Sequence, residues 1–237
     1  RHGPVKHPTL SVGQNHDQRV PVHQGKVIWT YSTGTSYEYD DLWMLSNGNI
    51  LFYRMEYISM ITPDKKVVWR YDCNASKGTN HTEIHTCQPI GLDKVMFVRN
   101  GLPPKLMVVN IKTKAVEVEH DLPAPSLTDR KTVHGQVRRA RYTAKGTYLV
   151  SFLSMNQVVE YDKSFKEIWK YETRQPWAAI RLKNGNTLIT DEKKDLTFEI
   201  NPKKETVWEL RPSDLPEAYR YDPSQSCTRL ANGNTII

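Results

Sequence analysis

One tripeptide recurs in this chain, at Asn47-Gly48-Asn49, Asn184-Gly185-Asn186 and Asn232-Gly233-Asn234. Two weaker copies, Leu92-Asp93-Lys94 and Lys145-Gly146-Thr147, lie between them. The five turns therefore follow one another at intervals of about 40 to 50 residues, which is the period of four-stranded propeller blades. Asn-Gly readily adopts positive φ, so each copy predicts a two-residue hairpin turn between two strands.

Tryptophans recur with the turns, because Trp29, Trp69, Trp169 and Trp208 each follow a Val or an Ile, and Val118 takes the same place in the weakest copy. Between turn and tryptophan lie two short segments in which apolar and polar residues alternate, which is typical of strands. A single blade leaves both faces of its sheet uncovered. We therefore expect the tryptophans to pack between neighbouring blades, with a sugar-stacking platform as the alternative.

These patterns predict an all-β protein, a β-propeller of four-stranded blades. Four whole blades are expected to end at Tyr71, Leu122, Tyr171 and Leu210. A fifth begins near Ser224, and Lys26–Tyr31 resembles the last strand of a blade. We expect residues 1–24 to form an unrepeated extension and residues 25–237 to form an incomplete propeller whose final blade is truncated. The whole propeller is expected to have seven blades, with six as the alternative.

The formal net charge of +7 on 237 residues favours an anionic partner such as an acidic polysaccharide or a sulfate ester. Ordinary solubilising charge is the alternative. The basic residues form no tract, which argues against a nucleic-acid partner, and no apolar run is long enough to predict a membrane span. Cys73 and Cys87 flank a polar loop with glycosylation sequons at Asn74 and Asn80, and their pairing stays open. We expect a secreted or periplasmic monomer.

In a propeller, the first strand of each blade runs along the central channel. Aligning the blades on their turns brings a polar set to the entries of these strands: Glu38, Tyr39, Asp40, His81, Glu83, His85, His134, Gln136, Arg138, Gln175, Trp177, Ser224 and Gln225. A water-filled channel without further function is one interpretation. The other is a functional site, because histidine exchanges protons near neutral pH, arginine binds carboxylate or sulfate bidentately, and tryptophan stacks on sugar rings.

Side-chain alternation refines this set. Arg139 is expected to point away from Arg138, which makes Arg138 the better channel residue. His81, Glu83 and His85 share one face if the segment is a strand, so a metal ion is geometrically possible there. We nevertheless expect no cofactor, with a structural metal ion as the alternative.

The segment NGNTLI, followed by a Glu-Ile-Asn-Pro strand and VWE, resembles the blade repeat of arylsulfate sulfotransferases. In that family, histidines and an arginine in the channel carry sulfuryl transfer. The repeat is also similar to that of quinoprotein-like propellers, whose GK-x-x-W motif is matched by Gly25–Trp29. No adjacent cysteine pair or calcium set supports a quinone cofactor.

A second resemblance rests on the blade repeat, the His-containing N-terminal segment, and the HTEIHTCQP and HGQVRRARY segments. Together they resemble propeller enzymes of polysaccharide-degrading bacteria. These include α-L-rhamnosidases of the glycoside hydrolase family 145 type, which remove rhamnose from glucuronic acid, and lyases of the rhamnose-glucuronate or ulvan type. In such lyases a histidine and a tyrosine act as base and acid, while an arginine neutralises the uronate.

The resemblance to the lyases implies catalytic roles for His85, His134 and Tyr142, with Arg138 on the substrate carboxylate. The resemblance to the rhamnosidases instead implies a site on the other face, at His16. Further substrate contacts are expected from Tyr39, Glu83, Gln136 and Trp177. No pair of carboxylates with a clear glycosidase arrangement is visible in the sequence.

We therefore expect an enzyme that cleaves an acidic polysaccharide of rhamnose and uronic acid, by hydrolysis or by β-elimination. One alternative is an arylsulfate sulfotransferase with a channel histidine as nucleophile. The other is a propeller that only binds its partner.

Overall fold

The computed structural model of the chain describes residues 9–12, 19–23, 26–27, 29–34, 38, 41–73, 81–222 and 224–237. They belong to two compact units, the first formed by residues 1–99 with 106–119 and the second by residues 100–105 with 120–237. Strands dominate the described residues, and the only helices among them are three short 3-10 turns, Arg130–Thr132, Pro212–Asp214 and Glu217–Tyr219. The predicted all-β class is confirmed. No helix in the described part of the chain is long and apolar enough to cross a membrane.

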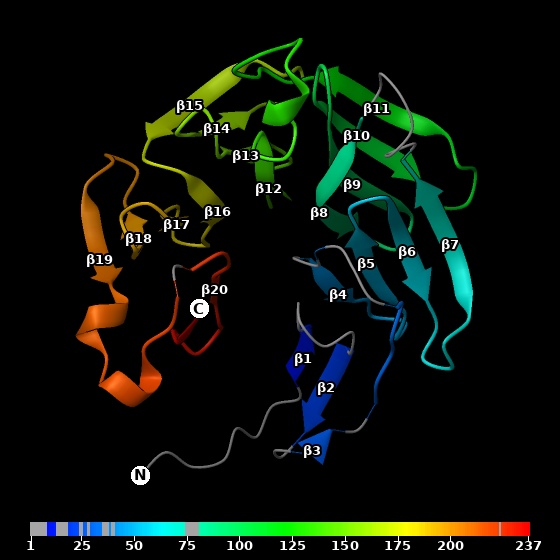
Figure 1. The fold of residues 1–237 in the computed structure, drawn as a ribbon, viewed down its shortest axis with the longest axis horizontal. Coiled ribbons are helices and arrows are strands. Elements are labelled where there is room, and N and C mark those ends of the chain that lie inside the picture. Colours follow the sequence, from blue (N-terminus) through cyan, green and yellow to red (C-terminus); the bar gives the residue numbers. More distant parts are fainter. Residues whose placement is uncertain are drawn as a thin grey trace. The chain divides into compact units, whose positions relative to one another are not determined.

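Four sheets of four strands follow the chain order, and in each sheet consecutive strands are neighbours (Figure 1). The first contains β4 (Leu42–Met44), β5 (Ile50–Arg54), β6 (Tyr57–Ile61) and β7 (Val67–Asp72). The second contains β8 (Glu83–Ile90), β9 (Lys94–Asn100), β10 (Lys105–Asn110) and β11 (Val116–Asp121). The third contains β12 (Val137–Tyr142), β13 (Tyr148–Phe152), β14 (Gln157–Tyr161) and β15 (Glu167–Glu172). The fourth contains β16 (Pro176–Arg181), β17 (Thr187–Asp191), β18 (Leu196–Ile200) and β19 (Thr206–Leu210).

Two smaller sheets accompany these four. β20 (Thr228–Arg229) and β21 (Thr235–Ile236) form a hairpin, as expected for the start of a fifth repeat. β1 (Thr9–Val12), β2 (Arg19–His23) and β3 (Lys26–Val27) form a three-stranded antiparallel sheet. Within the expected strand Lys26–Tyr31, regular pairing is limited to β3, which pairs with β2.

The Asn-Gly turns are longer than the predicted two-residue hairpins. At the first, Gly48 N donates to Leu45 O (2.9 Å) and Leu45 N donates to Asn49 O (2.8 Å). The Asn47 side chain accepts from Asn49 N at 3.0 Å, and positive φ falls on Gly48 alone. A type I turn closed by a left-handed glycine explains this three-residue connection. The same backbone bonds recur around Gly146, Gly185 and Gly233.

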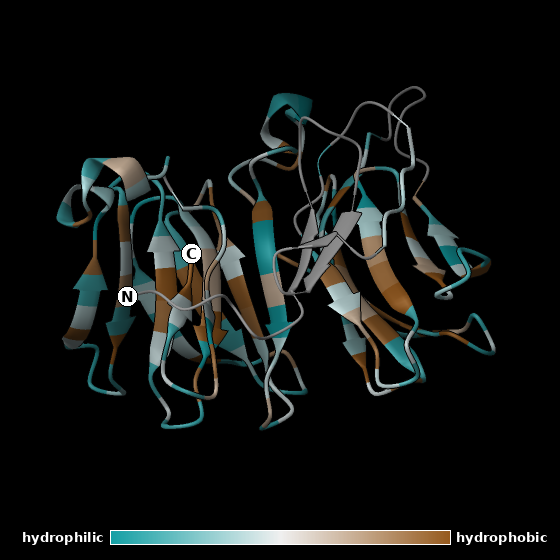
Figure 2. Cartoon of the chain, turned by 90° about the horizontal axis from the view of Figure 1, so that it is seen from below, coloured by the Kyte–Doolittle hydropathy of each residue, from teal (hydrophilic) through white to brown (hydrophobic). Residues whose placement is uncertain are grey.

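Aromatic side chains fill the spaces between successive sheets within each unit, as predicted. In the first unit, Trp69 is buried in a core that the β4–β7 sheet shares with residues of β8, β9 and β10. In the second unit, Trp169 packs against a core shared by the β12–β15 and β16–β19 sheets. Trp208 packs against the core of Ala178, Leu188 and Cys227. Figure 2 shows the apolar residues concentrated in the strands and the hydrophilic ones in the turns.

A charged contact repeats beside these tryptophans in the second unit. Arg181, the last residue of β16, pairs with Glu160 of β14, and its guanidinium lies 4.5 Å from the ring centre of Trp169. Arg229 of β20 pairs with Glu199 of β18 at 2.7 Å and lies 4.9 Å from the Trp208 ring centre. Each arginine therefore ties the first strand of one sheet to the sheet before it.

All three cysteines are free thiols and are buried. Cys73 and Cys87 lie in the same core of the first unit, but the Cys73 thiol donates to the carbonyl of Met55 at 3.2 Å instead of forming a disulfide. Burial raises the pKa of Cys73 to about 11 and that of Cys227 to about 12. The pairing that the sequence left open is therefore not formed.

We predict that Phe198→Ala, in the core shared by the third and fourth sheets, lowers the free energy of unfolding by about 3–5 kcal/mol, because a buried aromatic side chain leaves a cavity. Urea denaturation followed by circular dichroism measures this. Val207→Ala on the exposed surface of β19 is the matched control, with an expected change within about 0.5 kcal/mol. A loss below about 1 kcal/mol for Phe198→Ala would contradict the packing described.

We also predict that the three thiols react with an alkylating reagent at pH 8 only after unfolding. At a pKa of about 11, only about one Cys73 in a thousand is thiolate at this pH, and burial excludes the reagent. Mass spectrometry with and without denaturant counts the labelled thiols. Rapid labelling of the native protein, or a mass gain on reduction, would show that the thiols are exposed or paired.

Candidate functional site

Four titratable side chains form a connected cluster in the first unit. The segment His81–His85 enters β8, and residues 81, 83 and 85 share one face, as the alternation predicted. Glu83 joins the two histidines: its Oε1 lies 2.6 Å from His81 Nε2 and its Oε2 lies 2.8 Å from His85 Nε2. Glu38 Oε2 lies 3.3 Å from the other ring nitrogen of His85, Nδ1. The order of the cluster is therefore His81, Glu83, His85, Glu38.

Burial differs sharply along this cluster. The His85 side chain is completely buried and Glu83 is nearly so, whereas the His81 side chain is 38 % exposed and that of Glu38 is 30 % exposed. Strand β8 holds the centre in place, because Ile84 N donates to Met55 O at 2.9 Å and the Ile84 side chain lies in the hydrophobic core. The cluster thus has a rigid interior and two accessible ends.

Asp41 fixes the strand just beyond the cluster. Its Oδ2 accepts from the Thr86 hydroxyl at 2.8 Å and from Cys87 N at 3.0 Å. Trp43 Nε1 donates to the Cys87 carbonyl at 2.7 Å. These contacts hold the register of β8 through the residues that follow His85, so the imidazole has little freedom to move away from its carboxylates.

Arg138 and Trp177 come together in the second unit through a repeated irregularity. The pairing of β12 with β13 shifts between Val137 and Arg139, and that of β16 with β17 shifts between Pro176 and Ala178. Arg138 and Trp177 are thus the extra residues of two β-bulges, which re-aim side chains. The guanidinium lies 4.4 Å from the Trp177 ring centre, and both side chains are buried.

This arrangement favours a packing role for the pair. One face of the Trp177 ring is covered by the guanidinium, and burial leaves neither side chain the open surface that a sugar ring or uronate would need. Arg139 is buried as well and donates from Nη2 to the Gln225 carbonyl at 3.2 Å. The prediction that Arg138 and Arg139 have different partners holds, but both lie inside the protein.

Gln136 serves the fold rather than a ligand. Its side-chain Nε2 donates to Gly101 O at 2.8 Å and its Oε1 accepts from Gly101 N at 2.9 Å. Asn100 makes the same kind of reciprocal pair with Val137, at 3.0 and 3.3 Å. Because both amide groups of Gln136 are engaged with backbone, the expected substrate contact is not available to it.

Tyr142 lies away from the strand entries. It ends β12 and packs beside Tyr148, with ring centres 5.5 Å apart. It stands four residues before Gly146, the same position that Arg181 and Arg229 hold before Gly185 and Gly233. The predicted acid therefore belongs to the turn end of its strand, about 13 Å of extended chain from Arg138. Counting back from the turn glycine would have revealed this from sequence.

The remaining predicted residues are placed as follows. His134 is exposed in the turn that leads into β12. His16 and Tyr39 lie outside the described residues. His81 and Glu38, which belonged to the aligned polar set but received no role, are the accessible members of the cluster. Their signal in the sequence was the spacing of two between His81, Glu83 and His85.

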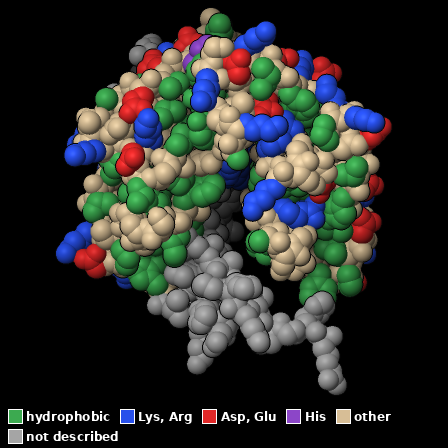
Figure 3. Space-filling view, turned by 180° about the vertical axis from the view of Figure 1, so that it is seen from behind, with side chains coloured by type: hydrophobic (Ala, Val, Ile, Leu, Met, Phe, Trp, Pro, Cys, Tyr) green, Lys and Arg blue, Asp and Glu red, His purple; other side chains and the backbone are tan. Residues whose placement is uncertain are grey.

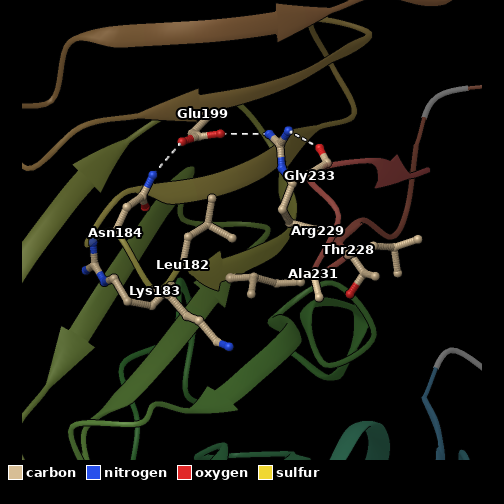
Figure 4. A pocket seen from close by; sticks show the side chains of 11 residues that line it. Leu182, Lys183, Asn184, Glu199, Thr228, Arg229, Ala231 and Gly233 are labelled. Atoms are coloured by element: carbon tan, nitrogen blue, oxygen red, sulfur yellow. Dashed lines mark hydrogen bonds and ion pairs between the residues drawn. The ribbon is translucent and has the colours of Figure 1, made fainter.

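A separate hollow of about 640 Å³ lies in the second unit. The end of β16 and its turn line one side, Glu199 and the β20–β21 hairpin the other (Figure 4). Arg229 points from the hairpin to Glu199 and also donates to Gly233 O at 3.1 Å. None of the sequence-predicted site residues lines this hollow, and its arginines are already paired with glutamates of the preceding sheets.

No family model and no curated protein matches this chain. Solved structures do match it. A protein of unknown function from Bacteroides caccae is 19% identical, with a TM-score of 0.79 over 94% of this chain and 79% of that one. A functionally unknown protein from Desulfotomaculum acetoxidans is 10% identical, with a TM-score of 0.62 over 94% and 69%.

A third match is a catalytically inactive virginiamycin B lyase from Staphylococcus aureus, solved with quinupristin. It is 10% identical, with a TM-score of 0.58 over 82% of this chain and 63% of that one. This chain has a β-propeller fold. At such identities the likeness shows the fold alone, and the number of blades in the whole propeller stays a prediction.

We predict that Gln136→Leu lowers the free energy of unfolding by about 2–3 kcal/mol, because it strands the buried N–H and C=O of Gly101 without partners. Urea denaturation measures the change. Gln157→Leu, at a half-buried position of β14, is the control and should cost less than about 1 kcal/mol. Full stability of Gln136→Leu combined with lost ligand binding would restore the substrate-contact interpretation.

Proposed function

We propose that this protein is an enzyme that cleaves an acidic polysaccharide of rhamnose and uronic acid by general acid–base catalysis, with β-elimination as the favoured reaction. The observation that supports it is the cluster of His81, Glu83, His85 and Glu38. It supplies a partly exposed imidazole backed by a buried carboxylate, the arrangement that orients a general base.

Elimination needs a base that removes the proton next to the uronate carboxylate and an acid that protonates the leaving oxygen. His81 is the accessible imidazole of the cluster and is proposed as the base. Glu83 holds its ring through Nε2, which leaves Nδ1 as the nitrogen for the substrate proton. The notebook of residue types alone favoured His85 in this role, but a completely buried side chain cannot contact a polymer.

The anionic substrate class is supported by the net charge of +7. Lys and Arg side chains lie interspersed with Asp and Glu on the face seen in Figure 3, so the excess charge acts as a diffuse attraction rather than as a single tract. A flexible polyanion is attracted by such a field, whereas duplex nucleic acid calls for a concentrated basic stripe.

Sulfuryl transfer is the less favoured reaction. It needs a histidine nitrogen free to attack sulfur, and both ring nitrogens of His85 face carboxylate oxygens within 3.3 Å. The rhamnosidase alternative centres on His16, outside the described residues. A lyase occurs among the propellers that share this fold, which supports the class of reaction but not the substrate.

We predict that the full-length protein, given a rhamnose-capped polysaccharide that contains glucuronate, produces the ultraviolet absorbance of an unsaturated uronide. His81→Ala should lower kcat by about 10²–10⁴-fold, the contribution of a general base. Free rhamnose is followed by chromatography in the same samples. His120→Phe is the matched control, because His120 stacks on Phe165 in the second unit and should leave the rate unchanged.

Rhamnose without absorbance would replace elimination by hydrolysis and direct attention to His16. An active His81→Ala variant would remove the cluster from the reaction. Silence of the wild-type protein with this substrate, together with tight binding of it, would favour the propeller that only binds.

A further inference from the structure

The two accessible side chains of the cluster do not depend on separate supports. His81 and Glu38 are connected by an unbroken series of short contacts through two buried groups, of 2.6 Å, 2.8 Å and 3.3 Å. Each contact joins a ring nitrogen to a carboxylate oxygen, so a proton can lie on either atom. Groups that can both accept and donate at each step are what proton transfer along a chain requires.

The buried centre favours transfer over structural pairing alone. A hydrophobic or neutral polar pair would fill the same volume without the cost of burying ionisable groups. Here His85, with no exposed surface, has a carboxylate on each ring nitrogen, and Glu83 has a histidine on each oxygen. Both buried residues are bifunctional and are used through both of their functional atoms.

Other charged groups of this unit have different engagements. Among its described residues, the buried charged side chains besides Glu83 and His85 are Asp41 and Arg54. Asp41 accepts from Thr86 and from Cys87 N, and Arg54 donates to the Thr33 hydroxyl and, at 3.4 Å, to the Gly34 carbonyl. Neither contact interrupts the series from His81 to Glu38.

We propose that His81, Glu83, His85 and Glu38 form a proton relay whose two ends serve as base and acid in the same reaction. The starting state has a proton on Nε2 of His81 and on both ring nitrogens of His85, with both glutamates ionised. When His81 Nδ1 takes a proton from substrate carbon, the Nε2 proton passes to Glu83 Oε1. The Nδ1 proton of His85 then passes to Glu38 Oε2.

The transfer balances. One proton has entered at His81 and one is presented at Glu38, and the electron pair of the broken C–H bond stays on the substrate, where it expels the leaving oxygen. Glu38 protonates that oxygen. Loss of one proton to water at His81 and gain of one at Glu38 restore the starting state. Glu38 is thereby assigned as the acid in place of Tyr142, and His85 acts through its neighbours as a positioning residue.

The substrate of this relay rests on the proposed function, but its wiring does not, so the test is made without substrate. Nitrogen NMR of the full-length protein labelled in histidine follows the His81 ring. We predict that Glu38→Gln shifts the His81 ring signals although the two side chains are joined only through Glu83 and His85. Glu56→Gln, which removes a carboxylate of the same unit outside the cluster, should leave them unchanged.

The decisive comparison is the same Glu38→Gln change made in a protein whose relay is already broken. In a His85→Phe background, or in Glu83→Gln if the first does not fold, the relay predicts that the His81 signals no longer respond. An undiminished response would show a direct electrostatic field and overturn the relay, as would the absence of any response in the otherwise wild-type protein.

Activity separates this proposal from the function on which it draws. With an active substrate, Glu38→Gln should lower kcat by about 100-fold with little change in KM. NMR coupling without any turnover would leave the relay standing and refute the substrate. Turnover that Glu38→Gln does not impair would keep the enzyme and refute the relay.

Discussion

The structure depends on the need of each four-stranded sheet to cover two apolar faces. Within each unit this is met by packing one sheet on the next, with Trp69 or Trp169 in the space between them. Burial of such aromatic surface contributes more to the stability of the fold than any single polar contact. The recurrence of the tryptophan in the sequence reflects this requirement, because each new sheet presents the same space to be filled.

Packing of this kind also decides where chemistry is possible. The turn ends of the first strands are occupied by side chains that tie one sheet to the next, as Arg181 and Arg229 do through glutamates and tryptophans. The entry ends are less constrained by that repeat. In the first unit the entry of β8 holds the cluster of ionisable groups, whereas in the second unit Gln136, Arg138 and Trp177 are consumed by packing and backbone contacts.

The strands, the turns and the tryptophan packing could be predicted from the sequence because alternation and turn chemistry are local properties. The contacts of Arg138 and Trp177 could not, because each lies in a bulge, and a bulge is set by register against a partner strand. The face shared by His81, Glu83 and His85 was predictable from spacing alone. The partnership with Glu38 was not, since it joins residues on different segments of the chain.

Burial explains why the accessible residues of the cluster, and not its most striking member, are the ones to bind substrate. His85 attracts attention in the sequence because it lies between polar residues at a strand entry, yet its side chain has no surface to offer. A group so placed acts only through what it touches. If the cluster is catalytic, its chemistry must leave through His81 and Glu38, and the distance between those two ends then sets the size of the bond that the protein can cleave.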